Sequence, residues 1–225
     1  MKTLAVCLVA IAAMNLSYPM TAAASALRFS VDGGAYTTCG DGAPCDVNGA
    51  TGAVTTIPTL PFFSVNVTTG LTQPVLSNPD VMDLNSINIF SGDTAAHSLL
   101  IEFSEIGLPF SGSLIGDVGG SLNAAPGSTI SFSAFIDETN TLFGRATQID
   151  TTQAFGVGAY SGSFAHIGPS VTPYSLTQVV EISFAGGSSG SASFDFDLTV
   201  PEPASIALLA VGFGALGFSR RIVRS

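Results

Sequence analysis

Apolar and polar residues alternate with a period of two along the middle of the chain, which is the pattern of a β-strand with one buried face. The clearest case is residues 192–200, where Ala, Phe, Phe, Leu and Val alternate with Ser, Asp, Asp and Thr. The same alternation occurs in residues 179–184, 130–136 and 99–103. No stretch shows the spacing of three to four residues that marks an amphipathic helix. We therefore predict strands in these four segments.

Shorter apolar segments between turn-forming residues extend the same pattern. The turn formers occur in residues 32–34, 78–80, 91–93, 125–127 and 186–187, which are rich in Gly, Pro, Asn and Asp. Weaker strand candidates are residues 27–31, 53–57, 62–67, 86–90, 111–115, 154–159 and 161–167. About ten short strands with such turns predict an all-β fold, an antiparallel β-sandwich for which a jelly-roll-like connectivity is one possible form.

The N-terminus has the three parts of a secretory signal peptide. Lys2 precedes an apolar run at residues 4–13, and small residues fill positions 21–26. About ten apolar residues are too few for a bilayer crossing, which needs roughly 20. We predict that residues 1–26 form a signal helix that signal peptidase removes, with cleavage after Ala26 favoured and cleavage after Ala24 as the alternative.

The C-terminus carries a different set of signals. Pro201, Glu202 and Pro203 precede an apolar stretch at residues 204–218. Three arginines follow this stretch: Arg220, Arg221 and Arg224. We predict a marginal transmembrane helix whose arginines stay in the cytoplasm, which leaves the middle of the chain on the outer side of the inner membrane.

This combination resembles the PEP-CTERM sorting signal of exosortase substrates. The resemblance covers residues 200–225 and implies that a membrane-embedded exosortase recognises the tail and cuts near Pro201–Pro203. It also implies an inner-membrane intermediate, followed by delivery to the cell surface or extracellular matrix of a bacterium that makes exopolysaccharide. The predicted organisation is therefore a signal peptide at 1–26, an exported domain at 27–199 and a sorting tail at 200–225.

The charge balance of the exported part excludes one class of partner. Residues 27–200 hold two of the six basic side chains and fifteen of the sixteen acidic ones, a net charge of −13. Two arginines cannot form the basic surface that a phosphate backbone requires, so we expect no nucleic-acid binding. The same charge keeps a secreted protein soluble and can attract divalent cations that bridge it to acidic polymers.

Two cysteines remain after removal of the signal peptide. Cys39 and Cys45 flank a five-residue loop, and the oxidising exterior favours a disulfide between them. Two cysteines without a nearby histidine do not make a zinc site, and the acidic loop at residues 41–49 lacks the spacing of a calcium-binding loop. We predict no cofactor and no metal site. Asp195 and Asp197 share one polar strand face, where they could hold a cation together with a neighbour.

No motif organises a catalytic site. His97 and His166 are the two histidines of the chain. Two pairs of nearby acids, Glu102 with Glu105 and Asp137 with Glu138, need measured distances before they can be judged. We expect no enzymatic activity and no catalytic residues.

The expected function follows from the tail and from what the middle lacks. An exported structural or adhesive role in an exopolysaccharide or biofilm setting ranks first. A carbohydrate-binding module, with or without calcium, is the alternative, and its aromatic platform would have to come from Tyr36, Tyr160 or Tyr174 because the chain contains no tryptophan. A secreted hydrolase ranks behind both.

Overall fold

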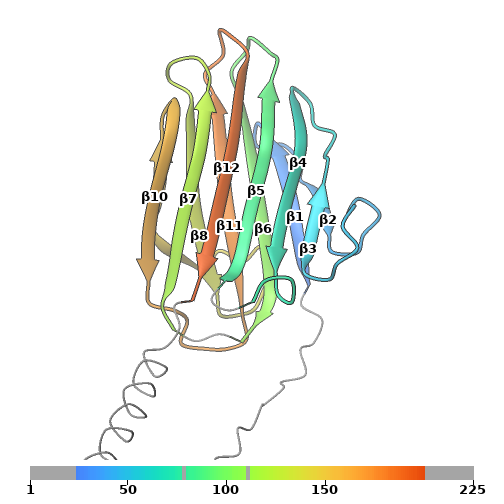
Figure 1. The fold of residues 1–225 in the computed structure, drawn as a ribbon, viewed down its shortest axis with the longest axis vertical. Coiled ribbons are helices and arrows are strands. Elements are labelled where there is room, and N and C mark those ends of the chain that lie inside the picture. The colour runs from blue at the N-terminus through green and yellow to red at the C-terminus, as the bar shows by residue number, and fades with distance from the viewer. Residues whose placement is uncertain (1–23, 78–79, 110–111, 201–225) are drawn as a thin grey trace, which may run out of the picture.

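The computed structural model describes residues 24–77, 80–109 and 112–200, which form two six-stranded antiparallel sheets packed face to face (Figure 1). Sheet A has the order β2 (Thr37–Gly40), β1 (Ser25–Val31), β6 (His97–Leu108), β11 (Tyr174–Phe184), β8 (Thr129–Asp137) and β9 (Thr147–Phe155). Sheet B has the order β10 (Gly158–His166), β7 (Leu114–Asn123), β12 (Gly190–Thr199), β5 (Asp80–Ser91), β4 (Phe63–Thr72) and β3 (Ala53–Thr56).

The connectivity is jelly-roll-like. From β5 onward, every connection except that between β8 and β9 passes from one sheet to the other. This crossing makes strand neighbours of segments that are distant in sequence, such as β6 with β11 and β5 with β12. The predicted all-β antiparallel sandwich is confirmed.

The two predicted terminal helices lie outside the described residues. Within 24–77, 80–109 and 112–200 the structure contains no helix long and apolar enough to cross a membrane.

The four clearest strand predictions are confirmed. Two of the weaker predictions have wrong bounds, and one short strand was not predicted. Residues 154–159 were predicted as one strand, but they contain the end of β9, a turn and the start of β10. The segment 111–115 reaches only the first two residues of β7. Strand β2 was not predicted, because its four residues Thr-Thr-Cys-Gly carry no apolar alternation.

Phenylalanine rings from both sheets fill the core. Phe132 of β8 is fully buried, and its ring centre lies 5.6 Å from that of Phe196 and 5.9 Å from that of Phe194, both on β12 of the opposite sheet. Gly116 on β7 makes room for another ring, since a Cβ there would lie 2.2 Å from Phe164. Large rings and small residues thus fit against one another between the two sheets.

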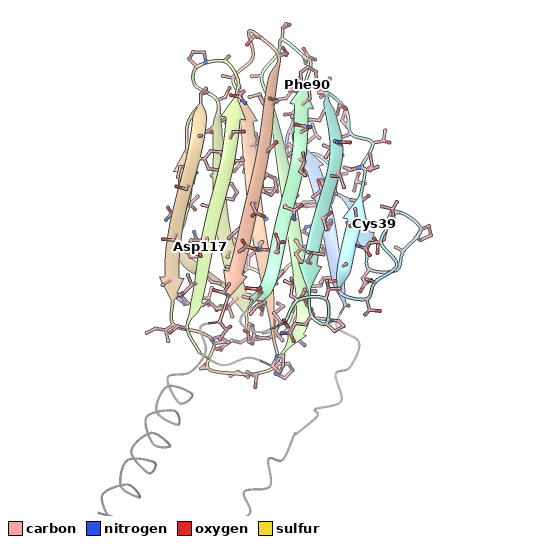
Figure 2. The ribbon with its side chains drawn as sticks, viewed as in Figure 1. Cys39, Phe90 and Asp117 are labelled. Carbon is pink, nitrogen blue, oxygen red and sulfur yellow. A yellow bond between two sulfur atoms is a disulfide. The ribbon has the colours of Figure 1, made fainter. Side chains whose placement is uncertain are left out.

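The predicted disulfide is present. Cys39 on β2 is buried and is bonded to Cys45 in the following loop, with their Cα atoms 5.8 Å apart. Figure 2 shows Cys39 at the β2 edge of the sandwich. In the same loop Asp46 accepts hydrogen bonds from the amides of Gly42, Asn48 and Thr55, so its carboxylate organises the turn.

Candidate functional sites

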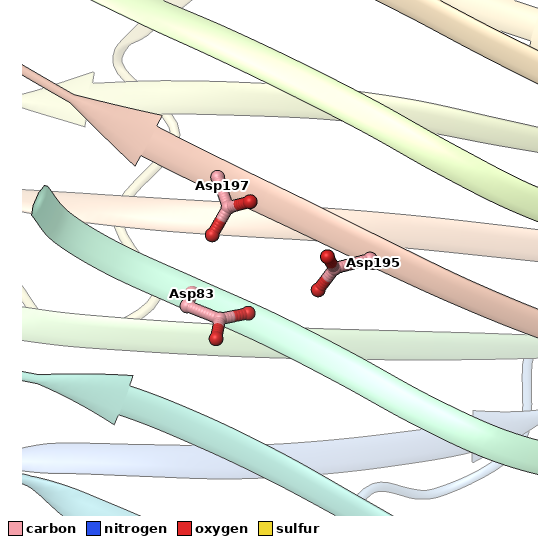
Figure 3. A group of neighbouring side chains, drawn as sticks. All are labelled: Asp83, Asp195 and Asp197. Carbon is pink, nitrogen blue, oxygen red and sulfur yellow. The ribbon is translucent and has the colours of Figure 1, made fainter.

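An acidic cluster occupies the outer face of sheet B. Asp83 on β5, Asp197 on β12 and Asp117 on β7 are successive cross-strand partners, and Asp195 precedes Asp197 by two residues on the same face. One carboxylate oxygen each from Asp83, Asp195 and Asp197 lies within 4.8 Å of the others (Figure 3). Figure 2 shows Asp117 farther along this face, on β7. Like charges placed opposite one another repel, so a proton or a cation would lower the energy of this group.

Burial and mutual repulsion raise the pKa values of two aspartates in this cluster. Burial, followed by the charges of Asp197 and Asp195, raises the pKa of Asp83 to about 7. Burial and the charges of three other aspartates raise the pKa of Asp197 to about 6. Oδ1 of Asp83 is buried without a hydrogen-bond partner. The cluster supplies three of the six to eight oxygen ligands that calcium takes, so it could hold either a shared proton or part of a cation shell.

Removing the charge of Asp83 should stabilise the protein at alkaline pH. The folded protein binds more protons than the unfolded chain between about pH 4 and pH 7 at this position, so stability falls as pH rises through that window. We expect Asp83→Asn to raise the free energy of unfolding at pH 8 by about 1 to 2 kcal/mol, a value reduced for solvent screening, with no comparable gain at pH 4. Urea unfolding at both pH values measures this.

The control for this prediction is Glu181→Gln, which changes an exposed carboxylate on the other sheet. Its stability should match that of the wild type at both pH values. A gain for Asp83→Asn that is equal at pH 4 and pH 8 would contradict the electrostatic explanation.

Sheet A carries a buried carboxylate on its outer face. Glu102 on β6 has a fully buried side chain, and its cross-strand partner Arg28 on β1 approaches Oε2 with Nη2 at 2.6 Å and Nε at 2.9 Å. Arg145, which lies between β8 and β9, donates from Nη2 to Oε1 of Glu102. The hydroxyl of Tyr36 donates to the same oxygen at 3.1 Å. Three donors therefore satisfy this single carboxylate.

Aromatic rings hold the two guanidinium groups in place. Cζ of Arg28 lies 4.0 Å from the centre of the Tyr36 ring and 4.1 Å from that of Phe143. Cζ of Arg145 lies 5.4 Å from the centre of the Phe135 ring. Such contacts stabilise a cation by about 0.5 to 2 kcal/mol each. Both arginines of the exported part are thus engaged with Glu102 and with rings.

The connection between β8 and β9 covers Glu102. The amide of Phe143 donates to Oγ of Ser104 at 2.8 Å, and Oδ1 of Asn140 accepts from the amide of Gly107 at 2.7 Å. Oγ of Ser175 donates to the carbonyl of Thr141 at 2.7 Å. These bonds tie residues 138–146 to β6 and β11, which explains why the outer face of sheet A is buried at this point.

Of the three candidate tyrosines, Tyr36 is the most exposed, and the guanidinium of Arg28 covers one face of its ring. Tyr36 is 46% exposed, whereas Tyr174 is fully buried and faces the core. Tyr160 stacks on Phe155 with ring centres 4.9 Å apart, and its hydroxyl donates to the carbonyl of Ser193. Tyr160 thus helps close the side of the sandwich where β9 and β10 meet.

His97 lies between two carboxylates. Nδ1 is 2.7 Å from Oδ2 of Asp32, Nε2 is 3.4 Å from Oδ2 of Asp93, and the imidazole stacks on Phe62 with centres 3.9 Å apart. The hydrogen bond that the imidazole donates to Asp32 is the main cause that raises the pKa of His97. A pocket of about 250 Å³ adjoins the ring. Since each nitrogen faces a carboxylate, this histidine has none directed at a serine, unlike the histidine of a hydrolytic triad.

The two acid pairs considered from the sequence do not form two-carboxylate sites. Glu102 and Glu105 are three residues apart on β6, so they face opposite sides of sheet A, outward and inward. Asp137 accepts hydrogen bonds from the amide and hydroxyl of Thr139, and Glu138 accepts from the amide and hydroxyl of Ser170. Asp137 therefore organises the turn that follows β8, whereas Glu138 ties this turn to Ser170, which is distant in sequence.

Both ends of the described chain lie at the same end of the sandwich (Figure 1). Ala24 is exposed, whereas Ser25 and Ala26 are buried in β1. Strand β12 ends at Thr199. Residues 201–225, which include the predicted sorting residues, lie outside the described part of the structure.

Comparison with known families gives a match to the tail. A family model described as the PEP-CTERM protein-sorting motif matches residues 199–224. The chain carries a PEP-CTERM motif. The matched residues include Pro201, Glu202 and Pro203 as well as all three C-terminal arginines, so the resemblance seen in the sequence is confirmed. The PEP-CTERM motif implies an exported protein that passes through a membrane-anchored intermediate.

The PEP-CTERM motif starts at the last residue of β12 and therefore follows the sandwich directly. It says nothing about the sandwich itself. No curated protein matches the chain in sequence.

Several solved structures share part of the fold at low similarity. The carbohydrate-binding module TmCBM61, solved in complex with beta-1,4-galactotriose, is 10% identical with a TM-score of 0.36, over 77% of this chain and 88% of that one. The mannan-recognising module TmCBM27 is 9% identical with a TM-score of 0.28, over 62% and 79% of the two chains. The enzymatically active domain of tailspike protein 4 of bacteriophage CBA120 is 10% identical with a TM-score of 0.35, over 67% and 19%. Likeness at this level says nothing about the ligands of this chain.

The sequence analysis missed residues of two of these sites, the acidic cluster on sheet B and the cluster around Glu102 on sheet A. Asp83 is the neighbour that Asp195 and Asp197 require, and its own alternation with Met82 and Leu84 placed it on a polar strand face. No sequence pattern predicts that Arg28 and Arg145 form ion pairs with Glu102. The sequence shows only that they are the two arginines of residues 27–200.

Proposed function

We propose that this chain is an exported surface or extracellular-matrix protein, processed by exosortase at its tail, with a structural or adhesive role in an exopolysaccharide setting. The observation that carries the proposal is the PEP-CTERM motif placed directly after a disulfide-containing β-sandwich. A disulfide fits an oxidising exterior. The strongly acidic middle fits a protein that stays soluble outside the cell and contacts acidic polymers through divalent cations.

The tail is expected to act in two steps. The apolar stretch at residues 204–218 holds the chain in the membrane, and the arginines after it stay in the cytoplasm. Exosortase then cuts near Pro201–Pro203. Prolines at 201 and 203 lack amide donors, so neither residue can donate a backbone hydrogen bond to a neighbouring strand.

Replacing the three residues of the sorting motif should prevent release. We expect a Pro201→Ala, Glu202→Ala, Pro203→Ala variant to remain in the membrane fraction with its tail intact, whereas the wild type reaches the surface or medium without it. Fractionation with antibodies to the sandwich and to the tail measures both. The matched control is Ser188→Ala, Ser189→Ala, which changes two exposed residues in the turn between β11 and β12. Release of the sorting variant at the wild-type level would contradict the exosortase step.

Carbohydrate binding is a second candidate function, and one observation favours it. Tyr36 presents a half-exposed ring beside the partly exposed guanidinium groups of Arg28 and Arg145, so an aromatic ring and charged hydrogen-bond donors lie together on this surface.

If that surface binds sugar, Tyr36→Ala should weaken retention of the released protein on the organism's own polysaccharide at least about tenfold, as the loss of a central aromatic contact would. Affinity electrophoresis with and without calcium measures retention. The matched control is Phe90→Ala, which removes a 45% exposed ring on β5 of the other sheet. No retention of the wild type in either condition would argue against a sugar-binding role.

A further inference from the structure

Glu105 is a buried carboxylate with one unpaired oxygen among the described residues. Its residue is 1% exposed, and its Oε2 has no hydrogen-bond partner among the described residues. Burial, followed by the charge of Asp41, raises the pKa of Glu105 to about 8. A buried carboxylate is costly unless a proton or a cation compensates it. The surroundings of Glu105 therefore favour either a proton on this carboxylate or a positive charge beside it.

Ser25, the first residue of β1, lies between Glu105 and Asp41. It is the cross-strand partner of Glu105 on β6, and on its other side the amide of Asp41 donates to its carbonyl at 3.0 Å. Cross-strand partners point to the same face of a sheet, so Ser25 and Glu105 both face inward. Asp41 directly follows β2, and its Oδ2 accepts a hydrogen bond from the amide of Gly52 at 2.8 Å. Oγ of Ser25 is also buried and unpaired.

The exported part has no basic side chain to place beside Ser25 and Glu105. The chain's one lysine is Lys2, within the predicted signal peptide. Arg28 and Arg145 both bind Glu102 on the opposite face of sheet A. Strands β3 and β4, which pack against β1 from the other sheet, contain no titratable residue. Glu105 and Asp41 are thus the titratable groups that lie beside Ser25.

The two cleavage positions predicted from the sequence leave different numbers of β1 residues in the mature chain. Cleavage after Ala26 would remove Ser25 and Ala26, which are both 3% exposed and paired with β6 and β2. Cleavage after Ala24 keeps the whole of β1 and breaks a single 3.3 Å hydrogen bond, from the amide of Ile106 to the carbonyl of Ala24. Small residues at both positions satisfy signal peptidase in either case, so the structure favours the cut after Ala24.

We propose that signal peptidase hydrolyses the Ala24–Ser25 bond and that the new α-ammonium group of Ser25 is the counter-ion of Glu105 and Asp41. Water supplies the hydroxyl that completes the Ala24 carboxyl group, and the Ser25 nitrogen keeps one hydrogen from that water and takes up a proton. This proposal rests on the export step of the proposed function. Export thereby completes the fold, because this positive charge forms only when the signal peptide is removed.

Mass spectrometry of the N-terminal peptide of the released protein tests the position of the cut. A start at Ser25 supports the proposal. A start at Ala24 or Leu27 overturns it while leaving export intact. A protein that retains Met1 and the signal peptide would overturn the proposed export as well.

Titration of the α-amine tests the ion pair. A protein that starts at Ser25 contains no lysine, so reductive methylation with ¹³C-formaldehyde labels the α-amine alone. We expect the pKa of this amine, followed by NMR, to be at least about one unit higher in the wild type than in Glu105→Gln, because a nearby opposite charge favours the charged amine. Glu181→Gln, the matched control, should give the wild-type value. Equal pKa values in the wild type and Glu105→Gln would overturn the ion pair.

Discussion

Phe132→Ala should lower the free energy of unfolding by about 3 to 5 kcal/mol, as is usual for a large buried aromatic residue. Phe132 is fully buried, and its ring centre lies within about 6 Å of four other aromatic rings, from Phe155, Tyr160, Phe194 and Phe196. Its removal leaves a cavity at the point where the two sheets meet, and the rigid strands around it cannot close that space. Guanidinium unfolding of the variant and the wild type measures the loss.

Phe90→Ala is the matched control for this prediction. Phe90, labelled in Figure 2, lies on β5 and is 45% exposed. Its replacement should lower the free energy of unfolding by less than about 1 kcal/mol. Comparable losses for the two variants would show that Phe132 is not the centre of the core.

Glu102→Ala should destabilise the protein by about 2 to 3 kcal/mol, close to the usual effect of removing one partner of a buried ion pair. The side chains of Arg28 and Arg145 are 21% and 36% exposed, so water partly compensates the two guanidinium groups and keeps the loss below the upper end of that range. The connection at residues 138–146 should loosen at the same time, because Arg145 ties it to β6. Chemical unfolding gives the first effect, and hydrogen exchange of that connection gives the second.

The control for Glu102 is Glu181→Ala, which truncates an exposed glutamate on the same sheet and should change stability by less than about 0.5 kcal/mol. If Glu102→Ala were no less stable than this control, the ion pairs would contribute nothing to the fold.

The sequence predicted most strands because alternation is a local property of a half-buried strand. Residues 192–200, for example, show five inward positions within one segment, and β12 forms there. The order of the strands could not be predicted in the same way. The pairing of β12 with β5 and β7 depends on contacts between distant segments, and no short pattern records them.

The candidate sites were likewise predictable only where their residues lie close together in the sequence. The sorting tail was predictable because its proline, apolar and arginine parts are adjacent in the chain. The acidic cluster was half predictable, since Asp195 and Asp197 share a strand but Asp83 comes from β5. The burial of Glu102 on a polar strand face was not predictable, because it depends on a loop folding over the outside of sheet A.

The most direct test of the central claim is intact mass spectrometry of the protein released from the cell surface or into the medium. Export with exosortase processing predicts a mass that ends near Pro201–Pro203 and lacks the two hydrogens lost in the Cys39–Cys45 disulfide. A released protein that extends through Ser225 would contradict processing at the PEP-CTERM motif.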